Sequence, residues 1–372
     1  MIALTAWAVA ALVAIWGLYP LVVALLARLR RPTAVAAPAE PPAVCAVVAT
    51  RDEPARVAAR VADLLAADYA PGRLRVVVGV DASVPDLAGT VAAVARLAPG
   101  ATVVAGDSPG GKAATLNAAV RAAGDAELLV FSDTGQRFAP ETVAALVAAF
   151  AEPAVGAVSG LLELPEEGAL TVAERYWRYE RRLRRDEARL HSAVGVTGAV
   201  YAMRRALWAP LPAGLILDDV YVPMRLVLAG HRIAYSVDAR ARDTRRFASG
   251  QEYRRKVRTL TGVIQLCAWL PAVLVPGRNP IWVQFLFHKL LRLLTPYLAL
   301  AIVVGAGAFA LGWLRTLPAA LLAGLVVAAI GLLLALPALR RRLVRQVAGV
   351  LALQAAIVVA TVNGLRGRWN VW

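Results

Sequence analysis

Cysteine and histidine are scarce in this sequence, and their scarcity excludes two kinds of site. The chain of 372 residues has two cysteines and three histidines. Cys45 lies in a strand-like run and Cys267 in an apolar segment, so they indicate no disulfide framework and fit a reducing compartment. His191, His231 and His288 do not have the spacing of metal-ligand pairs. The histidines are therefore predicted to be structural.

Lysine is also rare, although the chain is strongly basic. Of 41 basic residues only Lys112, Lys256 and Lys289 are lysines, and the formal net charge is +16. Such a charge indicates attraction to an anionic membrane surface or to a phosphate-rich substrate. The sequence has no aromatic–basic platform and no nucleic-acid motif, so we expect no nucleic-acid partner.

Long apolar runs are what the sequence has in excess. Apolar residues make up 59% of the chain and the mean hydropathy is +0.60, which is too high for an ordinary soluble enzyme. Residues 4–27, 293–314, 317–338 and 346–364 each reach the ~20 residues that cross a bilayer core. The sequence therefore predicts about four transmembrane spans, the first of them an uncleaved anchor.

These runs predict the domain organisation. We expect an N-terminal transmembrane anchor over 1–31, a globular domain over 41–260, membrane-interface helices over 261–292 and a C-terminal transmembrane region over 293–372. Arg28, Arg30 and Arg31 directly follow the first run. Because positive charge favours the cytoplasm, we predict a multi-pass protein of the inner (plasma) membrane whose globular domain is cytoplasmic.

The globular domain alternates strands with helices. Apolar runs predict strands over 43–49, 74–80, 101–105 and 126–132, each followed by a helical pattern. Asp52 is the expected cap of the first helix, over 53–67. This alternation predicts an α/β fold with parallel strands, and such sheets bind ligands at the carboxyl ends of their strands.

Acidic residues stand at those strand ends, and further charged groups follow later in the chain. Asp81 comes after the second strand and Asp133 after the fourth, and the pair Asp218–Asp219 opens a later helix. A basic helix over 249–264 then carries arginines. The alternative interpretation is that the acids only cap helices and that the arginines form a solvated or lipid-facing surface.

Five short motifs occur in one order: "VVVGVDAS", "GGKAATLNAAV", "FSDTG", "ILDD" and "RKVRT". Placed between apolar runs, they resemble the membrane-bound inverting glycosyltransferases of family 2, which include cellulose, hyaluronan and poly-N-acetylglucosamine synthases. The resemblance covers about residues 41–292. It implies a GT-A (Rossmann-like) domain that binds a nucleotide-sugar donor.

The resemblance also implies roles for particular residues. The expected donor-binding residues are Arg51, Glu53, Asp81, Lys112, Arg255 and Arg258. Asp81 matches the acid that accepts a hydrogen bond from uracil, which indicates a UDP-sugar, and Lys112 would meet the diphosphate. Asp133 matches the first acid of the motif that holds Mg²⁺ or Mn²⁺. Asp219 stands at the position of the general base, with Asp218 beside it.

The sequence departs from the family pattern at several positions. Gly135 replaces the second metal acid, Thr259 replaces a tryptophan near the acceptor, and Arg255 replaces a glutamine. Because divalent ions at such sites take many of their ligands from phosphates and water, one acid can suffice. We therefore interpret the turn after Ser132 as a functional metal-binding turn with a single carboxylate.

Three functions compete at this level. The first is a polymerase that extends a polysaccharide and passes it through its own spans. The second is a transferase that adds a single sugar to a lipid acceptor. The third is a degenerate, non-catalytic partner subunit, for which Gly135 and Thr259 argue. Membrane lipids are expected neighbours in each case, and a homo-oligomer or an accessory subunit is compatible with all three.

Overall fold

The computed structural model describes residues 2–30, 40–164, 172–243, 249–315, 318, 321–328 and 337–370. The chain forms two compact units. The first comprises Met1–Leu21, Phe247–Ile264 and Leu286–Trp372, and the second comprises Val22–Arg246 and Gln265–Phe285. Arg31 and half of the span predicted over 317–338 lie outside the described residues.

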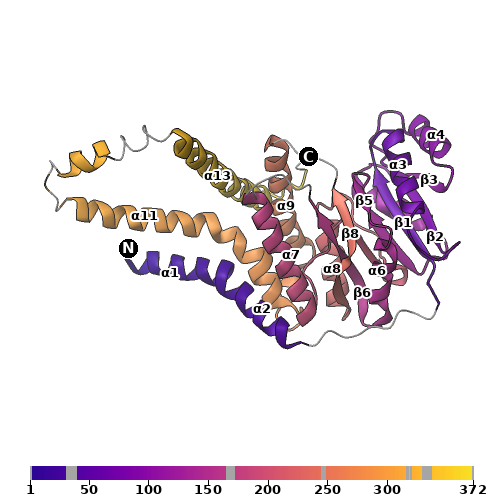
Figure 1. Ribbon diagram of the computed structural model, residues 1–372, viewed down its shortest axis with the longest axis horizontal. Coiled ribbons are helices and arrows are strands. Elements are labelled where there is room, and N and C mark those ends of the chain that lie inside the picture. Colours follow the sequence, from indigo (N-terminus) through magenta and orange to yellow (C-terminus); the bar gives the residue numbers. More distant parts are fainter. Residues whose placement is uncertain are drawn as a thin grey trace. The chain divides into compact units, whose positions relative to one another are not determined.

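The second unit is built on one mixed sheet of eight strands in the order β3-β2-β1-β4-β7-β6-β8-β5. The strands are β1 (Val44–Thr50), β2 (Leu74–Val80), β3 (Ala101–Ala105), β4 (Leu128–Ser132), β5 (Gln136–Phe138), β6 (Val155–Glu163), β7 (Tyr201–Arg204) and β8 (Arg232–Asp243). β1 to β4 are parallel, β6 runs parallel to β8, and β7 is antiparallel to both of its neighbours. The four predicted strands and the α/β fold class are therefore confirmed (Figure 1).

The helices of this unit follow the predicted alternation. They are α3 (Pro54–Leu65), α4 (Leu87–Leu97), α5 (Lys112–Arg121), α6 (Thr142–Ala148), α7 (Val172–Leu190), α8 (Asp218–Leu228) and α10 (Trp282–Phe285). One detail of the prediction was wrong. Glu53, not Asp52, is the N-cap of α3, and its side chain makes no capping hydrogen bond. Pro54 at the first helical position explains why the helix begins there without one.

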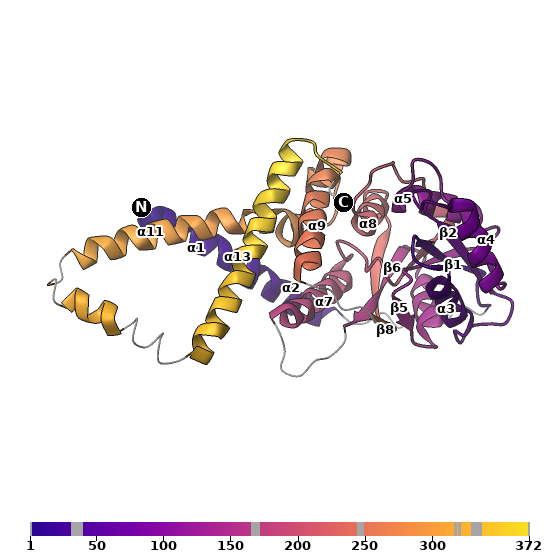
Figure 2. The ribbon, with the colours of Figure 1, turned by 90° about the horizontal axis from the view of Figure 1, so that it is seen from above.

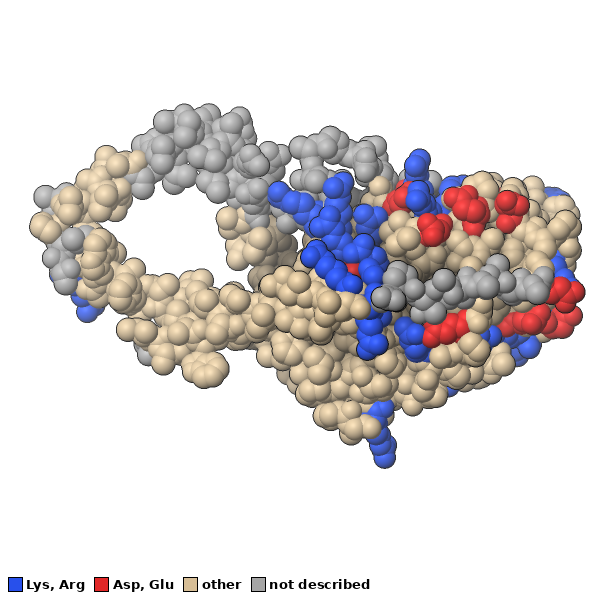
Figure 3. Space-filling model, turned by 60° about the horizontal axis from the view of Figure 1, so that its bottom comes forward, with Lys and Arg blue, Asp and Glu red and all other residues tan. Residues whose placement is uncertain are grey.

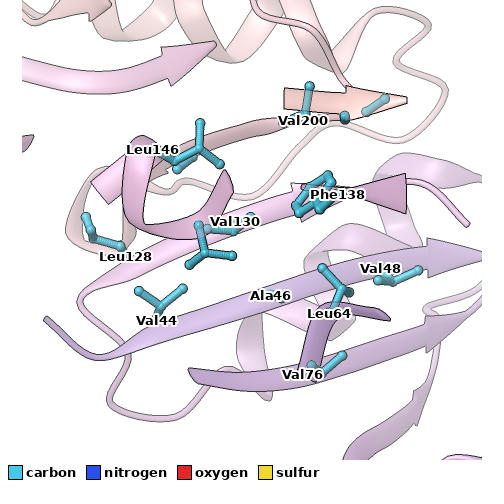
Figure 4. Packing of buried hydrophobic residues seen from close by; sticks show 14 of the residues in the cluster. Val44, Ala46, Val48, Leu64, Val76, Leu128, Val130, Phe138, Leu146 and Val200 are labelled. Carbon is cyan, nitrogen blue, oxygen red and sulfur yellow. The ribbon is translucent and has the colours of Figure 1, made fainter. Parts of the chain in front are cut away.

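The core of this unit lies between the sheet and the helices that cover it. Val44, Ala46 and Val48 of β1 are almost fully buried, and Ala46 is paired with Val130 of β4. Figure 4 shows Leu64 of α3 and Leu146 of α6 among the buried side chains of these strands. Full burial of such a side chain contributes about 1.5–3 kcal/mol, so this apolar layer fixes the strands whose ends carry the acids.

Long apolar helices make up most of the first unit, and their segments 22–29 and Trp282–Phe285 belong to the second unit. Among the described residues three helices are long and apolar enough to cross a membrane: Ile2–Leu29, Trp282–Leu314 and Val347–Leu365. They contain α1 (Ile2–Val13), α2 (Tyr19–Leu29), α11 (Thr295–Leu314) and most of α13 (Pro337–Leu365), while α9 (Ser249–Trp269) is the basic helix. α1 and α11 pack side by side (Figure 2), and the Trp16 indole N–H donates to the Thr295 hydroxyl across 3.1 Å. The predicted domain boundaries stay predictions.

Candidate active site

The predicted acids gather because of the order of the strands. β1 lies between β2 and β4, and the register aligns Thr50 of β1 with Val80 of β2. Asp81 and Asp133 are the residues that directly follow β2 and β4. They therefore lie at the same carboxyl edge of the sheet, as the sequence predicted.

Asp81 is held by backbone donors from two loops. Its Oδ1 accepts hydrogen bonds from the Ser83 and Gly111 N–H groups, each at 2.9 Å. Gly110 and Gly111 have φ angles of 95° and 92°, which favour glycine. A Cβ on Gly110 would lie 2.8 Å from Asp81 Oδ1. The Gly-Gly turn therefore ties the carboxylate to the start of α5.

Lys112 is the first residue of α5 and lies between two carboxylates. Its Nζ is 3.2 Å from Asp218 Oδ2 and 3.6 Å from Asp133 Oδ1, and about a third of its side chain (32%) is exposed. Burial lowers the pKa of Lys112, but Asp218, Asp133 and Asp219 raise it more, and the net direction is upward. The ammonium group is therefore charged at neutral pH. Of the three rare lysines, this one meets the predicted acids.

The pair Asp218–Asp219 opens α8, with Asp218 buried and Asp219 half-buried. Asp219 is fixed through its carbonyl, which accepts the Val196 N–H at 2.9 Å. A Cβ on Gly198 would lie 3.3 Å from the Asp219 Cβ and 3.7 Å from Lys112 Nζ. Because residue 198 is glycine, no side chain fills the narrow space beside Asp219 and Lys112.

Gln265 holds the loop that precedes this pair, and sequence reasoning did not find it. The residue is fully buried. Its side-chain oxygen accepts the Ile216 N–H at 2.9 Å, and its amide group donates to the Gly214 carbonyl at 2.9 Å. In the sequence Gln265 is a lone polar residue within an apolar stretch. That pattern does not reveal its role, because its hydrogen-bond partners are known only from the tertiary structure.

Arg60 is a second residue that sequence reasoning missed. Its guanidinium is fully buried beneath the end of β4 and donates to the Ser132 hydroxyl from Nε at 3.1 Å and from Nη2 at 2.7 Å. The Ser132 hydroxyl in turn donates to the Asp133 carbonyl at 2.9 Å. Burial lowers the pKa of Arg60 to about 10, against the opposing effect of Asp63, so the group stays charged at neutral pH. This chain of hydrogen bonds fixes the turn that carries Asp133.

The same turn is held from the other side by Asp52. Its carboxylate accepts a hydrogen bond from the Thr134 hydroxyl, and its backbone N–H donates to the Thr50 hydroxyl at 2.9 Å. Asp52 thus joins the loop after β1 to the loop after β4. This contact is its role in place of the predicted helix cap.

Two aromatic residues that follow Gly198 pack against β4. The Tyr201 ring stacks on Phe131 with centroids 4.5 Å apart, and Trp208 stacks on the same ring at 5.4 Å. Burial raises the pKa of Tyr201, and the carboxylates of Asp218, Asp219 and Asp133 raise it further. The Tyr201 hydroxyl is therefore neutral, and the residue lies close enough to these three carboxylates to feel their charge.

Four further residues were predicted to bind the substrate. Arg51 and Glu53 are exposed in the loop between β1 and α3. Arg255 and Arg258 lie on α9, in the part of that helix that belongs to the first unit. The roles of these four residues stay predictions.

The carboxylate oxygens at this edge of the sheet fit a divalent ion that binds together with a nucleotide. No group of three or more His, Cys, Asp or Glu side chains with metal-binding geometry occurs in the part of the chain that the structure describes. The Asp133 carboxylate, however, is about one third (34%) exposed at the strand end. One carboxylate with diphosphate oxygens and water can complete the shell of Mg²⁺ or Mn²⁺.

Replacing Arg60 by methionine should weaken the turn that carries Asp133. We expect a loss of about 3 kcal/mol in the free energy of unfolding, because the change removes the partner of Asp63 and leaves the Ser132 hydroxyl without its donor. Binding of Mn²⁺ with nucleotide should weaken in the folded protein, and calorimetry checks this. Arg60→Lys, which keeps the charge, should lose less stability, and exposed Arg96→Met should change neither quantity. Unchanged metal binding in folded Arg60→Met would contradict the role.

The comparisons with known proteins agree with this fold. The family described as "Glycosyltransferase like family 2" matches residues 41–262, which is more than half of the chain. This protein belongs to that family. No curated protein matches the sequence.

Among solved structures, one is similar over almost the whole chain. A mannosyltransferase from Pyrobaculum calidifontis, in complex with GDP-Man and Mn²⁺, is similar over 97% of this chain and 99% of its own, with a TM-score of 0.69 and 24% identity. Mannosyl-3-phosphoglycerate synthase from Rubrobacter xylanophilus is similar over 61% of this chain and 74% of its own, with a TM-score of 0.43 and 21% identity. The first likeness confirms the predicted GT-A fold with apolar helices.

Proposed function

We propose that this protein is an inverting glycosyltransferase that moves a hexose from a nucleotide diphosphate donor to an acceptor hydroxyl at the cytoplasmic face of the plasma membrane. The observation that carries the proposal is the position of Lys112, 3.2 Å from Asp218 and 3.6 Å from Asp133. Lys112 would supply a cation for the diphosphate, and Asp133 would supply a carboxylate for a metal ion. Asp219, the residue after Asp218, would be the general base. Such a set at the carboxyl edge of an α/β sheet suits group transfer from a nucleotide.

In this mechanism Asp219 accepts the proton of the acceptor hydroxyl as the hydroxyl oxygen attacks the anomeric carbon. The bond from that carbon to the diphosphate oxygen breaks, and its electron pair leaves with the nucleotide diphosphate. One displacement inverts the anomeric configuration. A positioned base typically contributes ~10²–10⁴-fold to the rate, and Lys112 faces the charge that develops on the leaving group.

Asp133 is the candidate ligand of a bound Mg²⁺ or Mn²⁺, which would neutralise further charge on the diphosphate. Arg60 and Asp52 keep its turn in place through Ser132 and Thr134. Because the protein offers one carboxylate here, we expect weak metal binding without nucleotide and tighter binding with it.

The geometry of Asp81 favours uracil over guanine as the base of the donor. A carboxylate oxygen has two lone-pair sites, and both sites of Oδ1 are engaged by Ser83 and Gly111. Oδ2 is then left for the base. Uracil offers one ring N–H, whereas guanine offers an adjacent pair of donors that suits two carboxylate oxygens. This supports a UDP-sugar donor, although the P. calidifontis enzyme was solved with GDP-Man.

We expect UDP to bind more tightly than GDP, and Asp81→Asn to reduce the difference. The asparagine keeps an acceptor oxygen for the turn but can present its amide group to the base. Loss of that hydrogen bond should weaken UDP binding about tenfold. Calorimetric titrations with UDP and GDP in the presence of Mn²⁺ measure this. Asp86→Asn, at the exposed cap of α4, is the control. Tighter binding of GDP would contradict the assignment of the base.

The apolar spans favour a lipid acceptor over a polysaccharide. The runs 4–27, 293–314, 317–338 and 346–364 contain no Asp, Glu, Lys or Arg, and few side chains that could hydrogen-bond to a sugar. A polysaccharide that crosses the bilayer needs polar groups or water along its path. A lipid acceptor keeps its apolar part in the bilayer and presents its hydroxyl at the surface. The polysaccharide remains the second candidate because of the family resemblance.

Product sizing separates these acceptors. The purified protein in nanodiscs would be given a labelled sugar nucleotide and a lipid extract. Label that stays in the organic phase, with one sugar added, supports the lipid acceptor. Label in long water-soluble chains would replace it by the polysaccharide. No incorporation and no hydrolysis with any donor would leave the non-catalytic subunit.

A further inference from the structure

Helix α7 presents a row of arginines to its exposed side. The exposed members are Arg175, Arg178, Arg182, Arg185 and Arg189, which we call the arginine stripe. Their spacings of three and four residues place them on one face of the helix, over about 21 Å of its length. Figure 3 shows basic side chains gathered in a band on this face of the molecule. The proposed reaction does not use these residues.

The acids of α7 are turned to the other side. Glu180, Asp186 and Glu187 are buried, and the helix packs against β8. Arg185 of the stripe reaches Asp186 at 2.8 Å. Among the side chains described in this helix, the fully exposed charged residues are all arginines and the fully buried charged residues are all acids, while Arg181 and Arg184 are half-buried.

The stripe ends beside the first apolar helix. Arg189 Nη2 donates to the carbonyl of Arg30 at 3.2 Å. Arg30 directly follows Ile2–Leu29, which is long and apolar enough to cross a membrane, and Arg28 is exposed beside it. α7 and the end of α2 lie close together in both views (Figures 1 and 2). If Ile2–Leu29 spans the bilayer, one end of the stripe lies at the level of the lipid headgroups.

We propose that the arginine stripe of α7 docks on the anionic lipid headgroups of the bilayer that Ile2–Leu29 enters. Guanidinium groups pair with phosphate oxygens in bidentate fashion, so a row of them suits phosphodiester headgroups. Each basic residue close to an anionic leaflet strengthens binding about fivefold, and the attraction is screened by salt. This docking holds the globular unit at the membrane surface and does not depend on the reaction.

Hydrogen exchange on the full-length protein in nanodiscs tests the docking. Backbone amides of residues 172–190 should exchange several-fold more slowly in phosphatidylcholine with phosphatidylglycerol than in phosphatidylcholine alone. High salt should reduce the difference. The triple change Arg175→Gln, Arg178→Gln and Arg182→Gln should abolish it, because three lost contacts together weaken headgroup binding on the order of a hundredfold.

The matched control removes the same charge elsewhere on the globular unit. Arg73→Gln, Arg96→Gln and Arg121→Gln change exposed arginines outside the stripe and should leave the lipid effect intact. Thermal melting of both variants tests that they fold. Exchange that is independent of lipid charge in the folded wild type would overturn the proposal. A stripe variant that keeps the lipid effect but has a raised donor KM would assign the stripe to substrate, and would overturn it too.

Discussion

Asp219→Asn is expected to lower kcat by about 10²–10⁴-fold while the affinity for nucleotide stays unchanged. Asparagine cannot accept the proton of the acceptor hydroxyl, but it preserves the size of the side chain. The carbonyl contact with Val196, which fixes Asp219, is a backbone contact and survives the change. Initial rates of nucleotide diphosphate release measure kcat, and calorimetry measures nucleotide binding.

The control for this prediction is Asp125→Asn, an acid with an 87% exposed side chain that pairs with Arg75 outside the site. It should change neither quantity. A second comparison is Asp218→Asn. Because Asp218 pairs with Lys112, this change should affect donor binding as well as the rate. An Asp219→Asn protein with normal turnover would show that another group is the base.

Lys112→Met is expected to lower kcat by about 10²–10³-fold, because it removes the cation that faces the leaving diphosphate. It should also change metal binding in a characteristic way. The ammonium group lies 3.6 Å from Asp133 Oδ1 and repels a cation there. Without it, Mn²⁺ alone should bind more tightly than in the wild type, although turnover is lost. Calorimetric titration with Mn²⁺ and rate measurements test the two effects together.

Lys112→Arg is the conservative comparison, since it keeps the charge but adds bulk next to Gly198, and we expect an intermediate rate. Arg121→Met, on the exposed side of the same helix, should leave both properties unchanged. If Lys112→Met kept its rate, the lysine would be a structural counter-ion of the acids and not a group that meets the diphosphate.

The sequence predicted the strands and their polar ends because both have local signals. Runs of valine such as that in β2 are typical of buried strands, and the acids stand directly after them. Parallel order then forces Asp81 and Asp133 to one edge. Lys112 was recognisable by its glycine-rich turn, and the Gly110 and Gly111 φ angles explain why that turn needs glycine.

The residues that hold the site in place had no such signal. Arg60 and Asp63 are three residues apart on a helix, a spacing that indicates an ordinary surface ion pair. Only the crossing of α3 over the end of β4 buries Arg60 and brings it to Ser132. Gln265 likewise depends on a contact with a loop about fifty residues earlier in the chain. The sequence around Asp52 indicated a helix cap, yet its carboxylate accepts a hydrogen bond from the Thr134 hydroxyl instead.

The central claim is that the carboxyl edge of the sheet transfers a sugar from a nucleotide. Nucleotide diphosphate release by the purified protein in nanodiscs, with Mg²⁺ or Mn²⁺ and a panel of sugar nucleotides, tests it most directly. We predict metal-dependent release from a UDP-sugar that is lost in both Asp133→Ala and Asp219→Asn. Release that is equal in wild type and in both variants, or no release from any donor when lipid extract is present, would contradict it.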